Sequence, residues 1–487
     1  MSHDQMKASV LVLTNSAPNY FHFFNNIACL LKQDGADVFF AVDSVFSRDI
    51  TNIDSLGFPI YEFSSFFKEH KIDTAILNKY KSYNLSSTLL SDFERAQVYG
   101  VWGKKDYDYF DRLKSALLSF FEKIITEKNI KYVLYENVSN TFSHIAWIVC
   151  QQHNLKYIGV GGSRLPGRFS ISSDPLNDNA AAEIFEQINS GSIEISEEVL
   201  AWCDDYLNNI EYIVPDYMKI NGLDNTGLFA KYFKTETFKK IRKTAKYIFD
   251  DPYYAFQTGN PFLTYLGLFK RNLYRKVKLQ FLKNYYDNAV EGEDYLLYPM
   301  HFHPESSTSI LSGSYLDEYE VIRNISFNLP EGVKLYVKDH ISAWGYPSLE
   351  FYRKLKKLPN VRVLHPNAPT KVLIKHSLAV ITLTSTVGYE ALLLGKKVFL
   401  FGRVFYEFHK NVVKITSPTE LFNLFLTHLG NDAITEREYS LRFLAAYYLS
   451  TYQGSLNLML KDELAKQKSR ELYYSVIKKF FKSNGIL

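Results

Sequence analysis

The sequence has little of what a secreted or metal-stabilised protein uses. Its 487 residues include only three cysteines, Cys29, Cys150 and Cys203, and none of them has CxxC spacing. This scarcity argues against a disulfide framework or a structural zinc site and fits a reducing cytoplasm. The N-terminal MSHDQMK leads directly into an apolar segment, so we expect no signal peptide. No apolar run approaches the ~20 residues that span a bilayer. The predicted location is therefore cytoplasmic, and a peripheral position at the inner face of the membrane stays open.

An excess of charge of one sign is also missing. The net charge of +4, from 56 basic and 52 acidic residues, is too small to indicate nucleic acid as a partner. Tryptophan is rare, with 4 residues, whereas Tyr (36) and Phe (37) are abundant. An aromatic excess suits sugar-stacking surfaces, membrane interfaces or an AT-rich genome. Composition alone leaves these three explanations open.

Length and pattern predict the architecture. A chain this long exceeds one hydrophobic core and predicts two main domains. Apolar, strand-like runs alternate with amphipathic, helix-like segments in residues 1–210 and again in 291–417. Such alternation implies parallel sheets with right-handed crossovers. We therefore predict an α/β, GT-B-like fold of two Rossmann-like doubly wound domains facing a cleft, with a basic helical insertion at 211–290 and C-terminal helices at 418–487.

The insertion at 211–290 is rich in aromatic and basic residues. Between Lys231 and Lys283, thirteen Lys or Arg stand against three acids, in segments such as KYFKTETFKKIRKTAKYIF and FKRNLYRKVKLQFLKNYYD. One interpretation is a helical insertion whose solvent-facing side is basic. The other is an interfacial helix pair attracted to anionic lipid, because aromatic residues between Lys and Arg suit the headgroup region.

Polar residues follow four predicted strands of the second domain. Ligands of open α/β sheets bind beyond the carboxyl ends of the strands, so we predict that these residues lie at a ligand site and that all of them except Glu305 bind a nucleotide-activated donor. They are His301, His303 and Glu305 in MHFHPES, Lys338 and His340 in VKDH, Thr384, Ser385, Thr386 and Glu390 in LTSTVGYE, and Arg403 in FGRV. The alternation in HFHPE predicts that its two histidines and its glutamate share one face. A metal site there is disfavoured, because no further ligand lies at suitable spacing.

Two of these segments have the chemistry that a nucleotide requires. Lys338 and His340 are a cation and a hydrogen-bond donor suited to phosphate. The hydroxyls of TST precede a predicted helix, whose N-terminus attracts anions. One of those hydroxyls is explained equally well as a helix N-cap. Glu390, one turn into that helix, is placed to accept hydrogen bonds from a ribose diol or simply to complement the helix dipole.

The first domain offers fewer candidates. Arg164 and Arg168, in GSRLPGR, have guanidinium groups that could bind a sugar carboxylate or a lipid phosphate in bidentate fashion. The glycines of GVGG do not match GxGxxG and are interpreted as a tight turn. Asp106 and Asp108 form a lone DxD, which supports a metal-dependent GT-A enzyme only weakly.

Together, these motifs carry a resemblance. From Tyr298 to about Tyr406, the order and spacing of YPMHFHPE, LYVKDH, LPNVRVLHP and ITLTSTVGYEALLLGKKVFLFG resemble the capsule polysaccharide biosynthesis family that includes the bacterial Kdo transferases. The first domain resembles the family more loosely, through YENVSNTFSHIAW and GVGGSRLPGRFSIS. The family's members often have proline after the histidine of the phosphate motif, whereas here His340 is followed by Ile341.

The resemblance implies a metal-independent GT-B glycosyltransferase without a further cofactor. Its donor would be a CMP-activated 2-keto-3-deoxy sugar acid such as Kdo, and its acceptor a glycan or lipid at the inner membrane. By position, His340, Ser385 and Thr386 would hold the phosphate, with Glu390 near the ribose. Transfer of a keto-sugar passes through an oxocarbenium-like state that a carboxylate can assist. Glu136, after the strand YVLY, and Glu305 are the candidate catalytic residues, although Glu136 also suits the start of a helix.

Three other functions remain open. They are a UDP-sugar-dependent transferase, a UDP-N-acetylhexosamine 2-epimerase of the same fold, and a non-catalytic assembly partner. The aromatic, basic insertion favours a transferase with a membrane-associated acceptor. The grouping of His301, Glu305, Lys338 and His340 at strand ends argues against an inactive scaffold, which has no physical need for them.

Overall fold

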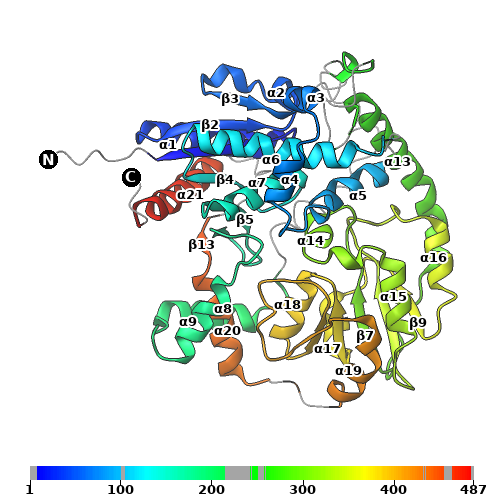
Figure 1. The fold of residues 1–487 in the computed structure, drawn as a ribbon. Coiled ribbons are helices and arrows are strands. Elements are labelled where there is room, and N and C mark those ends of the chain that lie inside the picture. Colours follow the sequence, from blue (N-terminus) through cyan, green and yellow to red (C-terminus); the bar gives the residue numbers. More distant parts are fainter. Residues whose placement is uncertain are drawn as a thin grey trace. The chain divides into compact units, whose positions relative to one another are not determined.

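The computed structural model describes residues 8–99, 105–213, 242, 244–249, 257, 259–430, 433, 435–454 and 463–483 (Figure 1). The chain divides into two compact units. Unit 1 comprises residues 1–178, 225–269 and 451–487, and unit 2 comprises residues 179–224 and 270–450. Each unit is built on its own sheet, as the sequence predicted. The first boundary differs from the expected position at residue 210, because the chain enters unit 2 after Asp178.

Unit 1 contains a seven-stranded sheet. Its strands are β1 (Ser9–Thr14), β2 (Asp37–Val42), β3 (Ile60–Glu62), β4 (Tyr132–Glu136), β5 (Lys156–Gly162), β6 (Arg168–Ser172) and β13 (Tyr452–Gln453). They lie in the order β3-β2-β1-β4-β5-β6-β13, and only β6 and β13 run antiparallel to their neighbours. The run SVLVLT of β1 is buried along its whole length, because helices cover both faces of a parallel sheet.

The helices of unit 1 follow the predicted alternation. They are α1 (Pro18–Gln33), α2 (Val45–Thr51), α3 (Phe63–Glu69), α4 (Thr74–Lys79), α5 (Leu90–Tyr99), α6 (Tyr109–Glu127), α7 (Thr141–Gln152) and α21 (Glu463–Ser483). Helix α1 begins at Pro18, within the segment SAPNYFHF that follows β1. Proline is tolerated in the first turn because its missing N–H has no partner there in any case.

The last helix, α21, returns to unit 1. The buried ring of Tyr473 stacks on Phe169, with 3.5 Å between ring centroids, and packs edge-on against Phe23 of α1. Lys478 Nζ lies 2.6 Å from the carboxylate of Asp34. The predicted C-terminal helical segment is therefore divided, because its part up to Ser450 belongs to unit 2.

Unit 2 contains a six-stranded sheet that is parallel throughout. Its strands are β7 (Tyr295–Pro299), β8 (Lys334–Lys338), β9 (Val361–Leu364), β10 (Ala379–Thr382), β11 (Lys397–Leu400) and β12 (Val412–Lys414). They lie in the order β9-β8-β7-β10-β11-β12. Counted within each unit, both sheets therefore begin 3-2-1-4-5, the strand order of a doubly wound Rossmann-like domain. The predicted fold class is confirmed for each unit.

Helices from both ends of unit 2 pack together. The helices of this unit are α8 (Ala180–Asn189), α9 (Glu197–Asn208), α14 (Ser306–Ser309), α15 (Glu318–Ser326), α16 (Leu349–Leu355), α17 (Thr370–His376), α18 (Thr386–Leu393), α19 (Leu421–His428) and α20 (Arg437–Leu449). Helices α8 and α9 both pack against α20. Trp202 of α9 lies 4.6 Å from Tyr448 between ring centroids. This contact between distant segments explains why 179–210 does not belong to the first domain.

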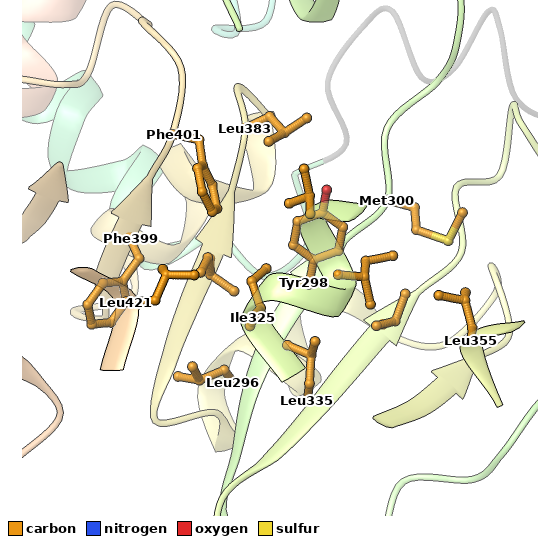
Figure 2. Close-up of a cluster of buried hydrophobic side chains, with 14 of the residues drawn as sticks. Leu296, Tyr298, Met300, Ile325, Leu335, Leu355, Leu383, Phe399, Phe401 and Leu421 are labelled. Atoms are coloured by element: carbon orange, nitrogen blue, oxygen red, sulfur yellow. The ribbon is translucent and has the colours of Figure 1, made fainter. Parts of the chain in front are cut away.

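The core of unit 2 lies between its sheet and α15 (Figure 2). Leu296 and Tyr298 of β7, Leu335 of β8 and Phe399 of β11 are fully buried on one face of the sheet together with Ile325 of α15. Alternate strand residues point to the same face of a sheet, so these side chains form one layer. That layer fixes the positions at which the strands end.

The aromatic, basic insertion is described only in part. Its first segment, 231–249, lies mostly outside the described residues, whereas the second lies largely on α13 (Pro261–Leu282), where the chain passes from unit 1 to unit 2. Within the described part of the chain, no helix combines the length and the apolar character needed to cross a membrane.

Candidate functional site

The shared strand order places a switch point in each sheet. The first strand of each unit lies between its second and fourth, so the connections leave in opposite directions at β1/β4 and at β7/β10. Ligands of open α/β sheets bind outside the carboxyl ends of the strands at such points. The loops after β7, β8 and β10 therefore form the candidate site in unit 2, and those after β1 and β4 the corresponding edge of unit 1.

His301 links the loops on both sides of the switch point in unit 2. Its backbone N–H and its Nδ1 lie 2.9 and 3.1 Å from Glu318 Oε1. Its Nε2 lies 3.2 Å from Thr382 Oγ1 and accepts from the Thr384 N–H at 3.4 Å. Because Thr382 Oγ1 already accepts from the Ser385 N–H, its own hydrogen is directed to Nε2, and Nδ1 carries the proton. Both ring nitrogens are thus occupied within the protein, and His301 positions the loops instead of offering a free donor.

Glu318, which the sequence pattern did not single out, is the buried carboxylate of this cluster. It accepts hydrogen bonds from Tyr298 OH at 2.9 Å and from His301, and its Oε2 lies 3.1 Å from His303 Nε2. Burial opposes its ionisation, but the hydrogen bonds from the two histidines outweigh burial and hold the pKa of Glu318 well below its ordinary value. Glu318 is therefore ionised, and it fixes the orientation of both imidazoles.

Glu305 does not join this cluster. Strand β7 ends at Pro299, so the two-residue alternation no longer holds beyond it, and His301 is buried while Glu305 is exposed. The expectation that His301, His303 and Glu305 share one face is wrong for this reason. The carbonyl of Glu305 accepts from the N–H and hydroxyl groups of Thr308 and Ser309, and its side chain makes no capping bond to α14.

Lys338 ends β8 in a buried position. Its Nζ donates to the carbonyl of Pro366 at 2.8 Å. Burial lowers the pKa of Lys338 to about 8, although the charges of Asp339 and Glu390 oppose that shift. Asp339 accepts from the hydroxyls of Tyr286 and Tyr352 at 2.6 and 2.7 Å. The ammonium group of Lys338 is thus bound to a backbone carbonyl, and its positive charge lies beneath the loop that follows β8.

His340 offers a free donor at the same strand end. Its Nδ1 accepts the Ser342 N–H at 3.2 Å, and no residue in the described part of the chain binds its Nε2. Burial, followed by the charges of His301 and Lys338, lowers the pKa of His340 to about 4, so the ring is neutral near pH 7. A neutral imidazole that accepts at Nδ1 must donate at Nε2. His340 therefore has an N–H available at the strand end, and its role at a phosphate stays a prediction.

The hydroxyl residues after β10 have separate roles. Ser385 is the N-cap of α18, and its Oγ accepts the Val387 N–H at 3.1 Å. The Thr384 hydroxyl donates to the carbonyl of Ser307 at 3.2 Å. Thr386 is the first helical residue, half-buried, and within the described chain no group binds its hydroxyl. The capping interpretation therefore holds for Ser385, and Thr386 is the hydroxyl that remains for a ligand.

A close contact locks the start of α18. The Tyr406 hydroxyl donates to the carbonyl of Ser385 at 2.7 Å. A Cβ at Gly388 would overlap that hydroxyl, so only glycine permits the contact. Gly402 is constrained in the same way, because a Cβ there would lie 2.7 Å from the Leu383 carbonyl oxygen. The loops after β10 and β11 are thus held together near the candidate site.

Glu390 is buried in the first turns of α18 between two lysines. Its Oε1 lies 3.9 Å from Lys371 Nζ, and Lys338 contributes a second positive charge. Burial raises the pKa of Glu390, while these lysines oppose the shift. Lys371, on α17, also donates to the carbonyls of Ile210 and Ile213. The carboxylate is therefore placed at the strand-end side of α18 among groups that favour its charged form.

Arg403 is more exposed than the rest of the site. Its backbone N–H donates to the Leu311 carbonyl at 3.0 Å, and its Nε lies 3.7 Å from Glu407 Oε1. An exposed i,i+4 pair of this kind contributes little stability and leaves the guanidinium accessible. Its predicted role at the donor stays a prediction.

Glu136 lies at the switch point of unit 1. It ends β4, is half-buried, and accepts from the Ser139 hydroxyl at 2.7 Å. Burial raises the pKa of Glu136, and hydrogen bonds from Ser139 and Tyr20 together with the nearby charge of Arg95 oppose that shift. The carboxylate is not the N-cap of the following helix, because Asn140 caps α7. The alternative assignment of Glu136 as a helix-start acid is therefore not supported.

Further acids surround the same edge of unit 1. Asp43 follows β2 and is buried, and burial together with the charges of Glu62 and Asp92 raises its pKa to about 7, against the hydrogen bonds of Ser47 and Ser44. Asp92 is also buried and accepts the Thr141 N–H at 2.9 Å. Asp43 is not among the residues predicted from the sequence, although its position directly after a buried strand is a visible signal.

The two predicted carboxylate-binding arginines differ. Arg168, the first residue of β6, donates from Nε to Thr451 Oγ1 at 2.8 Å and from Nη2 to the Thr451 carbonyl at 2.7 Å. Its fork therefore holds the segment that leads to β13, and it is not open to a ligand carboxylate. Arg164 lies half-buried in the loop between β5 and β6. Its predicted role stays a prediction.

Over the described ranges, no three His, Cys, Asp or Glu side chains are grouped in a way that could hold a metal ion. Asp106 and Asp108, the lone DxD, lie in the turn before α6, and Asp106 faces Arg112 at 4.0 Å.

One family model matches part of the chain. Residues 213–410 match the family model described as "Capsule polysaccharide biosynthesis protein". This segment includes β7 to β11 and all the unit 2 residues of the candidate site. No curated protein matches the chain in sequence.

Several solved structures are similar to the chain. The beta Kdo 2,4 transferase KpsC of Thermosulfurimonas dismutans is 15% identical, with 69% of this chain and 88% of that chain covered and a TM-score of 0.38. The UDP-GlcNAc 2-epimerase of Methanocaldococcus jannaschii is 10% identical, with 96% and 99% covered and a TM-score of 0.25. The S. aureus MnaA-UDP co-structure is 10% identical, with 99% and 98% covered and a TM-score of 0.29. The match of residues 213–410 confirms the resemblance to the capsule polysaccharide biosynthesis family that the sequence motifs indicated.

Proposed function

We propose that this protein is a glycosyltransferase of bacterial surface polysaccharide synthesis, of a capsule or a lipopolysaccharide. It transfers a sugar acid such as Kdo from a CMP-activated donor to a glycan or lipid-linked acceptor. The observation that carries the proposal is the family match over 213–410, which coincides with the strand ends of unit 2. The protein works at the cytoplasmic side of the membrane, without a metal, a further cofactor or nucleic acid.

The donor's phosphate is held at the edge of unit 2. His340 Nε2 donates to a phosphate oxygen, and the Thr386 hydroxyl and the N-terminus of α18 complete the anion site. Lys338 and Lys371 supply positive charge from behind. Glu390, held between them, accepts from the ribose hydroxyls. Loss of the donor's phosphate contact should therefore reduce nucleotide affinity and leave the sheet intact.

The nucleotide class is tested by thermal stabilisation. A ligand that binds only the folded protein raises the melting temperature by mass action. We expect CMP to raise it more than UDP or GDP at equal concentration. A larger rise with UDP would overturn the CMP-donor assignment and favour a UDP-sugar transferase or a UDP-N-acetylhexosamine 2-epimerase.

The chemistry is tested by release of nucleotide from a panel of CMP- and UDP-sugars, with and without acceptor glycans and with EDTA present. Glu136→Gln and Glu305→Gln are the matched variants, because Gln keeps the shape of the side chain and removes its charge. A catalytic carboxylate typically contributes ~10²–10⁴-fold, so loss of turnover with normal CMP binding identifies it. Normal turnover in both variants removes these residues from the mechanism, and no release from any donor favours a non-catalytic partner.

A further inference from the structure

Three of the five basic residues of α13 lie on its inner side. Arg271 and Arg275 lie over the ring of Tyr346, at 3.9 and 4.6 Å from its centroid. Lys278 Nζ donates to the carbonyls of Tyr346 and Pro347 at 2.8 and 2.9 Å. Burial, followed by the charges of the two arginines, lowers the pKa of Lys278 to about 8. These three basic side chains, together with the buried Leu282 and the partly buried Leu279, hold the C-terminal part of α13 to unit 2.

The opposite side of α13 is apolar and exposed. We call it the outer face of α13. It consists of Leu263, Leu266, Leu273, Tyr274, Val277 and Phe281. Their side chains are between 39% and 66% exposed, and their spacing of three, four or seven residues places them along one side of a single helix. A soluble protein rarely leaves such a continuous apolar stripe in water, so this face has a partner.

The charges around the outer face identify that partner. The helix PFLTYLGLFKRNLYRKVKLQFL contains no Asp or Glu. Lys270 and Lys276 are exposed on or beside the stripe, and Lys283 follows it. Near its start, the Asn260 amide donates to the carbonyls of Tyr247 and Ile248, which brings the almost fully exposed ring of Phe249 to the same end. Aromatic and aliphatic side chains with lysines at the edge match the interface of a membrane that contains anionic lipids.

We propose that the outer face of α13 binds the surface of an anionic lipid bilayer, with the helix lying in the plane of the headgroups. The apolar side chains enter the acyl boundary, and the lysines remain among the anionic headgroups. The proposal stands on α13 together with Phe249 and Lys283 beside it, and it adds a partner to the proposed function, since a lipid-linked acceptor is met at a membrane. It also favours the interfacial interpretation of the insertion, because a row of apolar side chains on α13 is exposed beside Lys270 and Lys276.

The experiment is sedimentation of the full chain with vesicles. One set contains phosphatidylcholine mixed with phosphatidylglycerol, and the other contains phosphatidylcholine alone. The test variant is L273S/V277S/F281S on the outer face. Its matched control is F422S/L426S on α19, where both side chains are also exposed. We expect the native chain and the control to bind the anionic vesicles, more weakly as salt is raised. The test variant should lose binding by about tenfold for each truncated side chain.

A second measurement guards against misfolding. All these substitutions are at exposed positions, so melting temperature and its rise with CMP should match the native protein. With Tyr274→Trp, the emission should shift to the blue on adding anionic vesicles, because the ring leaves water. Native chain that stays in solution with anionic vesicles, or a test variant that binds as the native does, overturns the proposal. If the native chain forms a dimer that the test variant does not form, and the native chain does not bind vesicles, the proposal is overturned. The partner of the outer face is then a second copy of this chain. If CMP still raises the melting temperature of the test variant while its vesicle binding is lost, membrane binding is separated from the proposed nucleotide binding.

Discussion

The two units place buried carboxylates near comparable sheet edges and shift their pKa values in opposite directions. In unit 2, Glu318 is surrounded by donors, and hydrogen bonds from His301 and His303 hold its pKa far below the ordinary range. In unit 1, burial and the charges of neighbouring acids raise the pKa of Asp43 to about 7. The strand order is the same in both units, so the fold does not determine this difference. The side chains that follow the strands determine it, and with it the class of ligand that each edge can accept.

Removing the carboxylate of unit 2 should have the largest effect. Glu318→Ala leaves the Tyr298 hydroxyl and the His301 N–H buried without their acceptor, and loss of one partner of a buried network costs about 3–5 kcal/mol. Because the pKa of Glu318 is lowered by folding, its contribution is full above its ordinary value of 4.5 and is lost as pH falls. Thermal melts at neutral and acidic pH measure both effects. Glu320→Ala, an exposed change on the same helix, is the control, and an equal loss there would contradict the role of Glu318.

Removing the charge in unit 1 should stabilise the protein. The pKa of Asp43 is raised by folding, so stability is full below its ordinary value of 3.8 and declines as pH rises towards 7. Asp43→Asn abolishes that decline. Its advantage over the native chain should grow from about pH 4 to pH 7 and reach as much as ~4 kcal/mol. Denaturant unfolding across this range measures it, and Asp37→Asn, at an exposed position of β2, is the control. A constant difference at every pH would show that Asp43 is already ionised.

The neutral His340 of unit 2 is tested through the affinity of the protein for CMP. His340→Ala removes a hydrogen bond to a charged phosphate and should weaken CMP binding by about 1.5–3 kcal/mol, with little change in melting temperature. His376→Ala, on the exposed side of α17, should leave affinity unchanged. Calorimetric titration of both folded variants measures the effect. Equal affinities would remove His340 from the phosphate site.

The smallest expected effect concerns the edge of unit 1. Arg168→Ala should destabilise the protein by about 1–2 kcal/mol, because its guanidinium holds Thr451 by two hydrogen bonds. Acceptor use should not change. A normal melting temperature with a raised KM for acceptor would restore the ligand-binding role that the sequence predicted for Arg168.

Local patterns were sufficient to predict the strands and most of the strand ends. Continuous apolar runs such as that of β1 identified the parallel strands, and the motifs after β8 and β10 located Lys338, His340 and Ser385 correctly at the sheet edge. The membership of α8 and α9 in unit 2 was not visible, because it depends on packing against α20, far away in the sequence.

Two of the missed site residues share one property. Glu318 and Lys371 look like ordinary surface residues of helices when only their neighbours in sequence are considered. Their burial and partners come from other strands and helices, as with Thr382 beneath His301. Sequence pattern can place a residue at a strand end, but hydrogen-bond partners and protonation depend on tertiary contacts.

The return of α21 to unit 1 sets the order in which this protein can mature on the ribosome. Unit 2 is closed by α20, and all its segments are translated before residue 451. Unit 1 needs β13 and the ring of Tyr473 against Phe169, and both are translated after the whole of unit 2. The first sheet to emerge is therefore the last to be finished, and its antiparallel edge stays open during elongation. A nascent chain truncated after Ser450 should be captured by chaperones through β6, and full-length release should end that capture.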